Sequence, residues 1–297
     1  MQLIPWSHPT SAGFTLRGWH SAPSGRPLLH FLHGNGFCGR TYEPMLQGLA
    51  KHFDLWLSDA QGHGDSDHGG KFVGWNRSAD LAVEALKAQG AAFQGVPCFA
   101  VGHSFGGVLT SLIVAEHPKL FQAAVLLDPV LFTPPMLLGA SVAELTGVMR
   151  HTPLARQARG RRDQWASRDE ARGNLTGRGT YKGWADEAMD AFLTHALADI
   201  EGGVRLKCRP SREAEIFGSM PDRLWSLLGR VRTPVHVLHA ERTFPFVSES
   251  VARWTSLNDH VSALQVPGGH CFMQERPAEA AGWVATELLA RLDAVSA

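Results

Sequence analysis

The chain has 297 residues, of which 44% are hydrophobic and 19% charged, and its 28 basic side chains balance 28 acidic ones. This composition excludes a disordered chain, and the length fits two domains or one large α/β domain with an insertion. A net charge of zero provides no field that attracts nucleic acid or an anionic membrane. We therefore expect a small-molecule partner, with no nucleic acid and no membrane, and leave the oligomeric state open.

The N-terminal segment MQLIPWSHPT has no basic stretch followed by an apolar run, so we interpret it as mature protein rather than as a secretion signal. The most apolar window, 123–140, is interrupted by Asp128 and three prolines, which a membrane-spanning helix would not tolerate. The four cysteines lack the spacing of a metal site or a disulfide scaffold. These features together favour free thiols and a cytoplasmic location.

In the first half of the chain, short apolar runs that end in Gly-rich turns alternate with amphipathic stretches. This alternation is typical of βαβ units and predicts a parallel sheet. Strands are expected over 27–32, 53–57, 98–101 and 123–127, with helices near 41–51, 77–88 and 106–117. The pattern resumes at residue 234 with the segments PVHVLHA and HVSALQV and a last helix over about 277–292.

The intervening segment, 132–232, is rich in Trp, Met, Leu and Arg and contains no runs of β-branched residues, so we expect a helical insertion. Its arginines are interleaved with acidic residues. Ion pairs along a solvated helix face are the simpler interpretation, and recognition of an anion is the alternative. The arginines are Arg150, Arg156, Arg159, Arg161, Arg162, Arg168, Arg172 and Arg178.

The segment Gly102-His103-Ser104-Phe105-Gly106 matches the pattern G-x-S-x-G at a point where an apolar run gives way to a predicted helix. A sharp turn with a strained serine leaves no room for side chains two residues to either side, which explains the glycines. The helix N-terminus beneath Ser104 would stabilise negative charge on a carbonyl oxygen. The motif therefore predicts that Ser104 is a nucleophile.

An oxyanion hole needs two convergent N–H groups, and a nucleophilic serine needs a base. The N–H of Phe105 follows the nucleophile directly, and the loop His33-Gly34-Asn35-Gly36-Phe37 offers the N–H of Asn35 as the second donor. His270 follows a Gly-Gly pair at the end of the last strand-like run, just before the closing helix. We expect it to be the base.

These residues resemble the α/β-hydrolase superfamily along nearly the whole chain. The shared features are HG after an early strand, GHGDS after the next, the GHSFGG turn, and a late GGH. The resemblance implies a mostly parallel, doubly wound α/β-hydrolase fold, with a core of 1–131 and 233–297 and a helical cap, 132–232, inserted after the sixth strand. It also implies Ser104 as nucleophile and His270 as base, with an acid between them in the chain order.

The acid is where the sequence departs from the family pattern. Many relatives carry it as G-E-x-D after the strand that matches PVHVLHA, but here the corresponding residues are Ala240-Glu241-Arg242-Thr243. A threonine hydroxyl cannot stabilise an imidazolium as a carboxylate does. Two candidates follow, Asp128 at the end of the preceding core strand and Glu241 two residues before the usual position. We favour Asp128, since some capped relatives place their acid there.

These features predict a serine hydrolase that cleaves an ester, thioester or lactone of a small, apolar substrate through an acyl-enzyme. A nucleophilic serine argues against dehalogenases and epoxide hydrolases of this fold. The alternatives are a lyase or cofactor-free oxygenase of the same fold, and a non-catalytic binding protein. The sequence has no dinucleotide or P-loop motif, and the chemistry requires neither cofactor nor metal. Candidate pocket aromatics in the insertion are Trp165, Trp184, Phe192 and Trp225.

Overall fold

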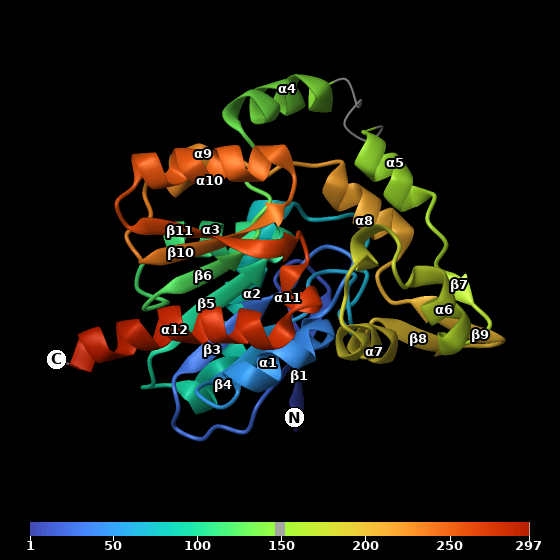
Figure 1. Cartoon of the computed structure of the whole chain (residues 1–297), viewed down its shortest axis with the longest axis horizontal. Helices are drawn as coiled ribbons and strands as arrows, with labels where there is room; N and C mark the ends of the chain where they lie inside the picture. The colour runs from blue at the N-terminus through green and yellow to red at the C-terminus, as the bar shows by residue number, and fades with distance from the viewer. Residues whose placement is uncertain (146–151, 297) are drawn as a thin grey trace.

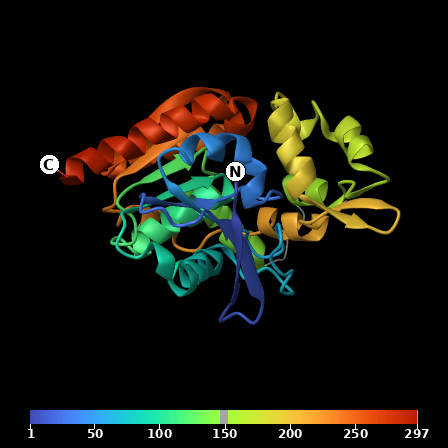
Figure 2. The same ribbon diagram turned by 90° about the horizontal axis from the view of Figure 1, so that it is seen from below.

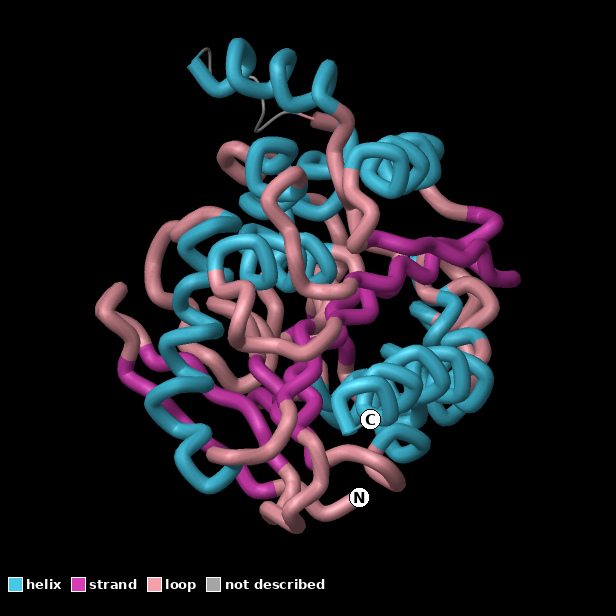
Figure 3. Tube along the Cα trace, turned by 90° about the vertical axis from the view of Figure 1, so that its left-hand side faces the viewer, coloured by secondary structure: helices cyan, strands magenta, loops and turns pink. Residues whose placement is uncertain are grey.

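The computed structural model describes residues 1–145 and 152–296 of the chain. Its centre is a twisted sheet (Figure 3). The sheet has eight strands in the order β1-β2-β4-β3-β5-β6-β10-β11. Pairs from β4 to β11 are parallel, whereas β1 pairs antiparallel with β2, and β2 with β4. The strands are β1 (Ile4–Pro9), β2 (Thr15–His20), β3 (Leu28–Leu32), β4 (Asp54–Ser58), β5 (Cys98–His103), β6 (Ala124–Leu127), β10 (Val235–Arg242) and β11 (Val261–Gly269).

The central strands form where continuous apolar runs were found, because both of their faces are buried. Every residue of β3, β4 and β6 is buried, as expected for parallel strands covered by helices on both sides. The predicted parallel sheet is confirmed. The hairpin of β1 and β2 was not predicted, since its strands mix polar and apolar residues at the sheet edge, where Trp6 Nε1 donates to Leu57 O at 3.1 Å.

Two layers of helices enclose the sheet (Figure 2). Helices α1 (Glu43–Leu49) and α12 (Pro277–Ser296) pack on each other over one face. Helices α2 (Trp75–Gln89), α3 (Phe105–Glu116) and α10 (Pro245–Leu257) bury their apolar residues on the other face. Shorter helical turns connect these elements: η1 (Gly39–Tyr42), η2 (Gly90–Phe93) and α11 (Phe272–Glu275).

The insertion follows β6, the sixth strand, and lies beside the carboxyl ends of the parallel strands (Figure 1). It is mostly helical in its described residues, and it also contains a three-stranded antiparallel sheet. Composition did not predict these strands because they are only two to four residues long. Its elements are α4 (Pro134–Leu145), α5 (Pro153–Arg159), β7 (Gln164–Trp165), α6 (Arg168–Leu175), η4 (Gly179–Tyr181), α7 (Asp186–His195), β8 (Leu197–Ile200), β9 (Gly203–Leu206), α8 (Pro210–Phe217) and α9 (Leu224–Leu228).

Buried polar contacts hold the insertion against the core. The guanidinium of Arg212, on α8, is fully buried and donates to the carbonyl oxygens of His68 at 2.7 Å and Gly70 at 2.5 Å. Helix α7 packs on η1 and α1, and α9 packs on α3. The insertion is thereby fixed over the end of the sheet. None of the helices within the described ranges is long and apolar enough to cross a membrane.

Candidate active site

Ser104 occupies a sharp turn between β5 and α3. Its backbone has φ 53° and ψ −113°, a conformation that costs free energy for a residue with a side chain. A Cβ at Gly102 would lie 2.3 Å from Gly106 O, and one at Gly106 would lie 2.2 Å from Leu32 O. Both positions of the G-x-S-x-G pattern therefore require glycine, and the turn that they allow presents the serine hydroxyl above the helix N-terminus.

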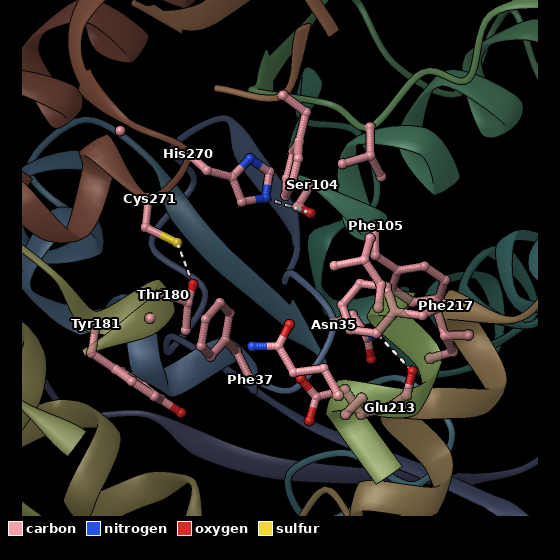
Figure 4. A pocket seen from close by; sticks show the side chains of 18 of the residues that line it. Asn35, Phe37, Ser104, Phe105, Thr180, Tyr181, Glu213, Phe217, His270 and Cys271 are labelled. Atoms are coloured by element: carbon pink, nitrogen blue, oxygen red, sulfur yellow. Dashed lines mark hydrogen bonds between the residues drawn. The ribbon is translucent and has the colours of Figure 1, made fainter. Parts of the chain in front are cut away.

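The structure brings Ser104, His270 and Asp128 into one hydrogen-bonded line. The three residues follow β5, β11 and β6, so parallel strands deliver all of them to the same edge of the sheet. His270 Nε2 lies 2.9 Å from Ser104 Oγ (Figure 4), and its Nδ1 lies 2.5 Å from Asp128 Oδ2. This arrangement can withdraw a proton from the serine and stabilise the resulting imidazolium.

Asp128 is completely buried and has a left-handed backbone, with φ 42°. Its Oδ1 accepts a 2.8 Å hydrogen bond from the backbone N–H of Ala240, and its Oδ2 accepts a second one from the hydroxyl of Thr243. Glu241, the alternative acid, is exposed at the end of β10 and makes no hydrogen bond to His270 in the described structure. Of the two candidates, only Asp128 contacts the imidazole.

The two expected oxyanion donors both line the cavity above Ser104. Within the described ranges, no protein group accepts a hydrogen bond from the backbone N–H of Phe105 or of Asn35. The loop that carries Asn35 is held to α3, because Gly106 N donates to His33 O at 3.1 Å. The Asn35 side chain binds the insertion, with Nδ2 donating to Glu213 O at 3.1 Å (Figure 4). Both N–H groups are thus available to a ligand.

A buried hydrogen-bond chain links His270 to the loop that carries Asn35. His103 Nε2 donates to His270 O at 3.0 Å, since a carbonyl oxygen only accepts. Burial, followed by the neighbouring His270, holds the pKa of His103 well below its usual value, so the ring is neutral and Nδ1 is an acceptor. The Tyr42 hydroxyl therefore donates to His103 Nδ1 at 2.6 Å and accepts from Gly34 N at 3.0 Å.

Above the serine lies a cavity of about 1140 Å³ between the core and the insertion. Five of the rings that line it contact one another in turn, edge to face or stacked, with successive centroids 4.8 to 5.9 Å apart. The last ring is 5.1 Å from that of His270. We call this set the aromatic arc. In order from the residue after the nucleophile, it comprises Phe105, Trp75, Phe132, Phe246 and Phe244.

None of the four candidate pocket aromatics of the insertion lines the cavity. Trp184 and Phe192 pack against Phe37 and one another, and Trp165 is buried within the insertion. Trp225 donates from its indole to Phe132 O. Rings in a helical layer are drawn into its own core, and most of the rings that face the cavity come from loops and helix ends of the core instead.

The thiols near the site are not set up as nucleophiles. Burial raises the pKa of Cys38 and of Cys271 to about 12, which keeps both thiols protonated at neutral pH. All four cysteines are free. In the ranges that the structure covers, no group of three or more His, Cys, Asp or Glu side chains could hold a metal ion.

The sequence did not point to three of the side chains that complete this site. Thr243 was recognised as a replacement for the usual acid, but not as a donor to Asp128. Tyr42 and His103 are 61 residues apart, and no local pattern relates them. For His103, the one feature of the sequence that could have pointed to the site was its position directly before Ser104.

Comparison with known proteins places these observations in context. Residues 31–283 match the model of the alpha/beta hydrolase family. The chain is similar to mouse monoglyceride lipase, with 34% identity over 122 residues, which cover 38% of this chain and 39% of the relative. It is also similar to the lipase LipV of Mycobacterium tuberculosis, with 28% identity over 90% of this chain and 95% of the relative.

Among solved structures, the chain resembles E-2-(acetamidomethylene)succinate hydrolase, with a TM-score of 0.77 and 21% identity over 96% of this chain and 98% of that one. At this level of identity the likeness concerns the fold. The fold expected from the sequence is confirmed.

Proposed function

The chain belongs to the alpha/beta hydrolase family, and we propose that it is a serine hydrolase that cleaves an ester, thioester or lactone of a small, largely apolar substrate through an acyl-enzyme. The observation that carries the proposal is the hydrogen-bonded line from Ser104 Oγ through His270 to Asp128, which opens on the cavity. This geometry supports Ser104 as nucleophile, His270 as base and Asp128 as acid.

In the first step, His270 Nε2 takes the proton of Ser104 as Oγ forms a bond to the substrate carbonyl carbon. The carbonyl oxygen becomes negative and accepts hydrogen bonds from the Phe105 and Asn35 N–H groups. His270 then gives its proton to the leaving atom, and the bond between that atom and the carbonyl carbon breaks. Asp128 remains ionised throughout and stabilises the imidazolium.

In the second step, water attacks the acyl-enzyme. His270 accepts a proton from the water, the same two N–H groups stabilise the second oxyanion, and the proton returns to Ser104 Oγ as the acid product leaves. The balance requires only side chains and water. The lipases to which the chain is similar support ester chemistry.

The cavity supports the proposed substrate size and polarity. At about 1140 Å³ it is slightly larger than the usual range for sites that enclose a small organic ligand, roughly 300 to 1,000 Å³. The aromatic arc supplies an apolar surface next to the nucleophile. The four free cysteines support our proposal of a reducing, cytoplasmic location.

The proposal is tested with p-nitrophenyl esters of increasing acyl length and a fluorophosphonate label. We expect the wild-type protein to hydrolyse the esters and to be labelled, and Ser104→Ala to do neither. Asp128→Asn should lower kcat by about 10⁴-fold, whereas Glu241→Gln, the matched control, should retain activity. Absence of both labelling and hydrolysis in the wild-type protein would overturn the proposal.

A further inference from the structure

The residues that line the cavity include more cations than carboxylates. Five contribute to it, against two carboxylates, those of Glu213 and Glu275. Such an excess of positive charge would weaken the binding of a wholly apolar substrate, because each charge next to an apolar ligand loses hydration. The five cations are Arg161, Arg162, Arg178, Lys182 and Arg242.

Three of these cations are already paired within the protein. Arg161 Nη1 lies 2.7 Å from Glu213 Oε2, and its Nη2 donates to the Tyr181 hydroxyl at 2.8 Å. Arg162 pairs with Glu170 at 2.6 Å outside the cavity, and the exposed Arg242 meets Glu275 at 3.5 Å. These contacts account for both carboxylates of the lining. They also agree with the simpler interpretation of the arginine-rich insertion, namely ion pairing.

Arg178 and Lys182 are different. Both side chains are exposed at the cavity, and in the described ranges neither has an ion-pair or hydrogen-bond partner. The two residues flank η4, a short turn whose ends are closed by hydrogen bonds from Tyr181 N to Arg178 O and from Lys182 N to Gly179 O. Two free cations are therefore held close together on one ordered segment, which we call the cationic segment (residues 178–183).

The cationic segment contacts the residue beside the base. Thr180 Oγ1 lies 3.4 Å from the sulfur of Cys271, next to His270 in the chain (Figure 4). Thr180 and Tyr181 lie on one side of the site in this view, and Phe105 and Phe217 lie on the other. The segment that carries the two unpaired cations thus lies across the site from Phe105, the first ring of the aromatic arc.

Resting on the function proposed above, we propose that the natural substrate is an ester or thioester with an apolar acyl group and a leaving group that carries a phosphate or carboxylate. The acyl group packs on the aromatic arc. The leaving group departs on the side of His270, which protonates it, and its anionic part binds Arg178 and Lys182. Anion recognition, the alternative interpretation of the arginine-rich insertion, is thus proposed for Arg178, together with the nearby Lys182. Arg150 lies outside the described residues.

The test compares thioesters that share a hexanoyl group and differ in the leaving thiol. Coenzyme A carries phosphates, mercaptopropionate carries a carboxylate, and N-acetylcysteamine is neutral; the released thiol is measured colorimetrically. The double variant Arg178→Gln/Lys182→Gln is compared with Arg230→Gln/Arg232→Gln, which removes the same charge from exposed positions that do not line the cavity.

For the wild-type protein, we expect a higher kcat/KM with at least one anionic thioester than with the neutral one, and a preference that weakens as salt is added. The double variant should reduce this ratio about tenfold, because two partly exposed ion pairs are worth roughly that much. The control pair should preserve it. The outcome also tells which anionic group is recognised.

A ratio near one in the wild-type protein, or the same ratio in the double variant as in the wild type, would overturn the inference. Either result leaves the proposed function standing, since the neutral thioester is still cleaved. Failure of the proposed function has a different signature. It would appear as no cleavage of any thioester and no fluorophosphonate labelling.

Discussion

The hydroxyl of Thr243 donates a hydrogen bond to Oδ2 of Asp128, the same oxygen that His270 contacts. Thr243 stands at the position where many members of the family carry their acid. In this chain the carboxylate that contacts the imidazole follows β6 instead of β10, and the residue at the usual position of the acid donates a hydrogen bond to it. Because β6 and β10 are neighbours in the sheet, either strand end can reach the same imidazole.

We predict that Thr243→Val lowers kcat about tenfold, since one hydrogen bond to a buried carboxylate is lost and contributes roughly 1.5 kcal/mol or more. KM should change little, because Thr243 does not line the cavity. Thr243→Ser is the matched control and should restore most of kcat. Steady-state kinetics with one p-nitrophenyl ester check this, and equal kcat for the Val and Ser variants would contradict it.

Tyr42→Phe tests the hydrogen-bond chain between base and oxyanion loop. Removing the phenol oxygen leaves Gly34 N–H and His103 Nδ1 without a partner in a fully buried place. We expect the free energy of unfolding to fall by about 2 kcal/mol or more, together with a lower kcat in the still-folded variant. Urea unfolding and kinetics measure the two effects. A variant as stable and active as the wild type would show that the chain has no positioning role.

Two glycine substitutions contrast a crowded position with an open one. Gly106→Ala places a Cβ 2.2 Å from Leu32 O and 2.6 Å from His33 O, both backbone atoms that cannot move independently. We expect it to lose at least about 3 kcal/mol of stability or to be insoluble. Gly282→Ala lies in α12 with no atom within 4 Å of the added carbon.

The alanine at position 282 should therefore stabilise the protein, by about 0.5 to 1 kcal/mol, through helix propensity and a less flexible unfolded chain. Thermal unfolding of the two variants beside the wild type makes the comparison. If Gly106→Ala is tolerated as well as Gly282→Ala, the serine turn does not require glycine at position 106.

A further prediction concerns acid stability. His30 is buried on β3 with its Nδ1 unpaired and its ring stacked on Phe121, and burial lowers its pKa from 6.5 to about 3. Between pH 6.5 and about pH 3, the unfolded chain therefore binds a proton at His30 that the folded chain does not bind. The stability that this group contributes is complete above pH 6.5 and is lost as the pH falls, by at most about 1.4 kcal/mol per pH unit.

His30→Phe removes this proton linkage and preserves the stacking on Phe121. We expect the stability of the variant relative to the wild type to increase steadily from pH 6.5 down to 4. Urea unfolding at several pH values measures the difference. A difference independent of pH would contradict the burial argument.

The parts of the fold that could be predicted are those that depend on residues close together in the sequence. Strands β3, β4 and β6 are continuous apolar runs because both faces are covered, and the glycines around Ser104 follow from one tight turn. His270 and Asp128 could be selected because each ends a strand of a parallel sheet, where residues far apart in the chain converge.

What could not be predicted depends on packing between distant segments. Nothing local indicates that Tyr42 meets His103, or that Thr243 binds Asp128. Aromatic content supplied the candidates for the cavity lining, but composition does not tell which side of a helix or strand faces the cavity. Trp165 and Phe192 face the core of the insertion, whereas Arg178 and Lys182, set among arginines that pair with carboxylates, face the cavity.

The most direct test of the account is the trapping of the acyl-enzyme. A p-nitrophenyl ester mixed rapidly with the protein should release a burst of p-nitrophenol equivalent to the enzyme present. Acid quenching followed by peptide mass spectrometry should then find the acyl group on Ser104, and the Ser104→Ala protein should show neither. An acyl group on another residue, or undiminished turnover by Ser104→Ala, would contradict the account.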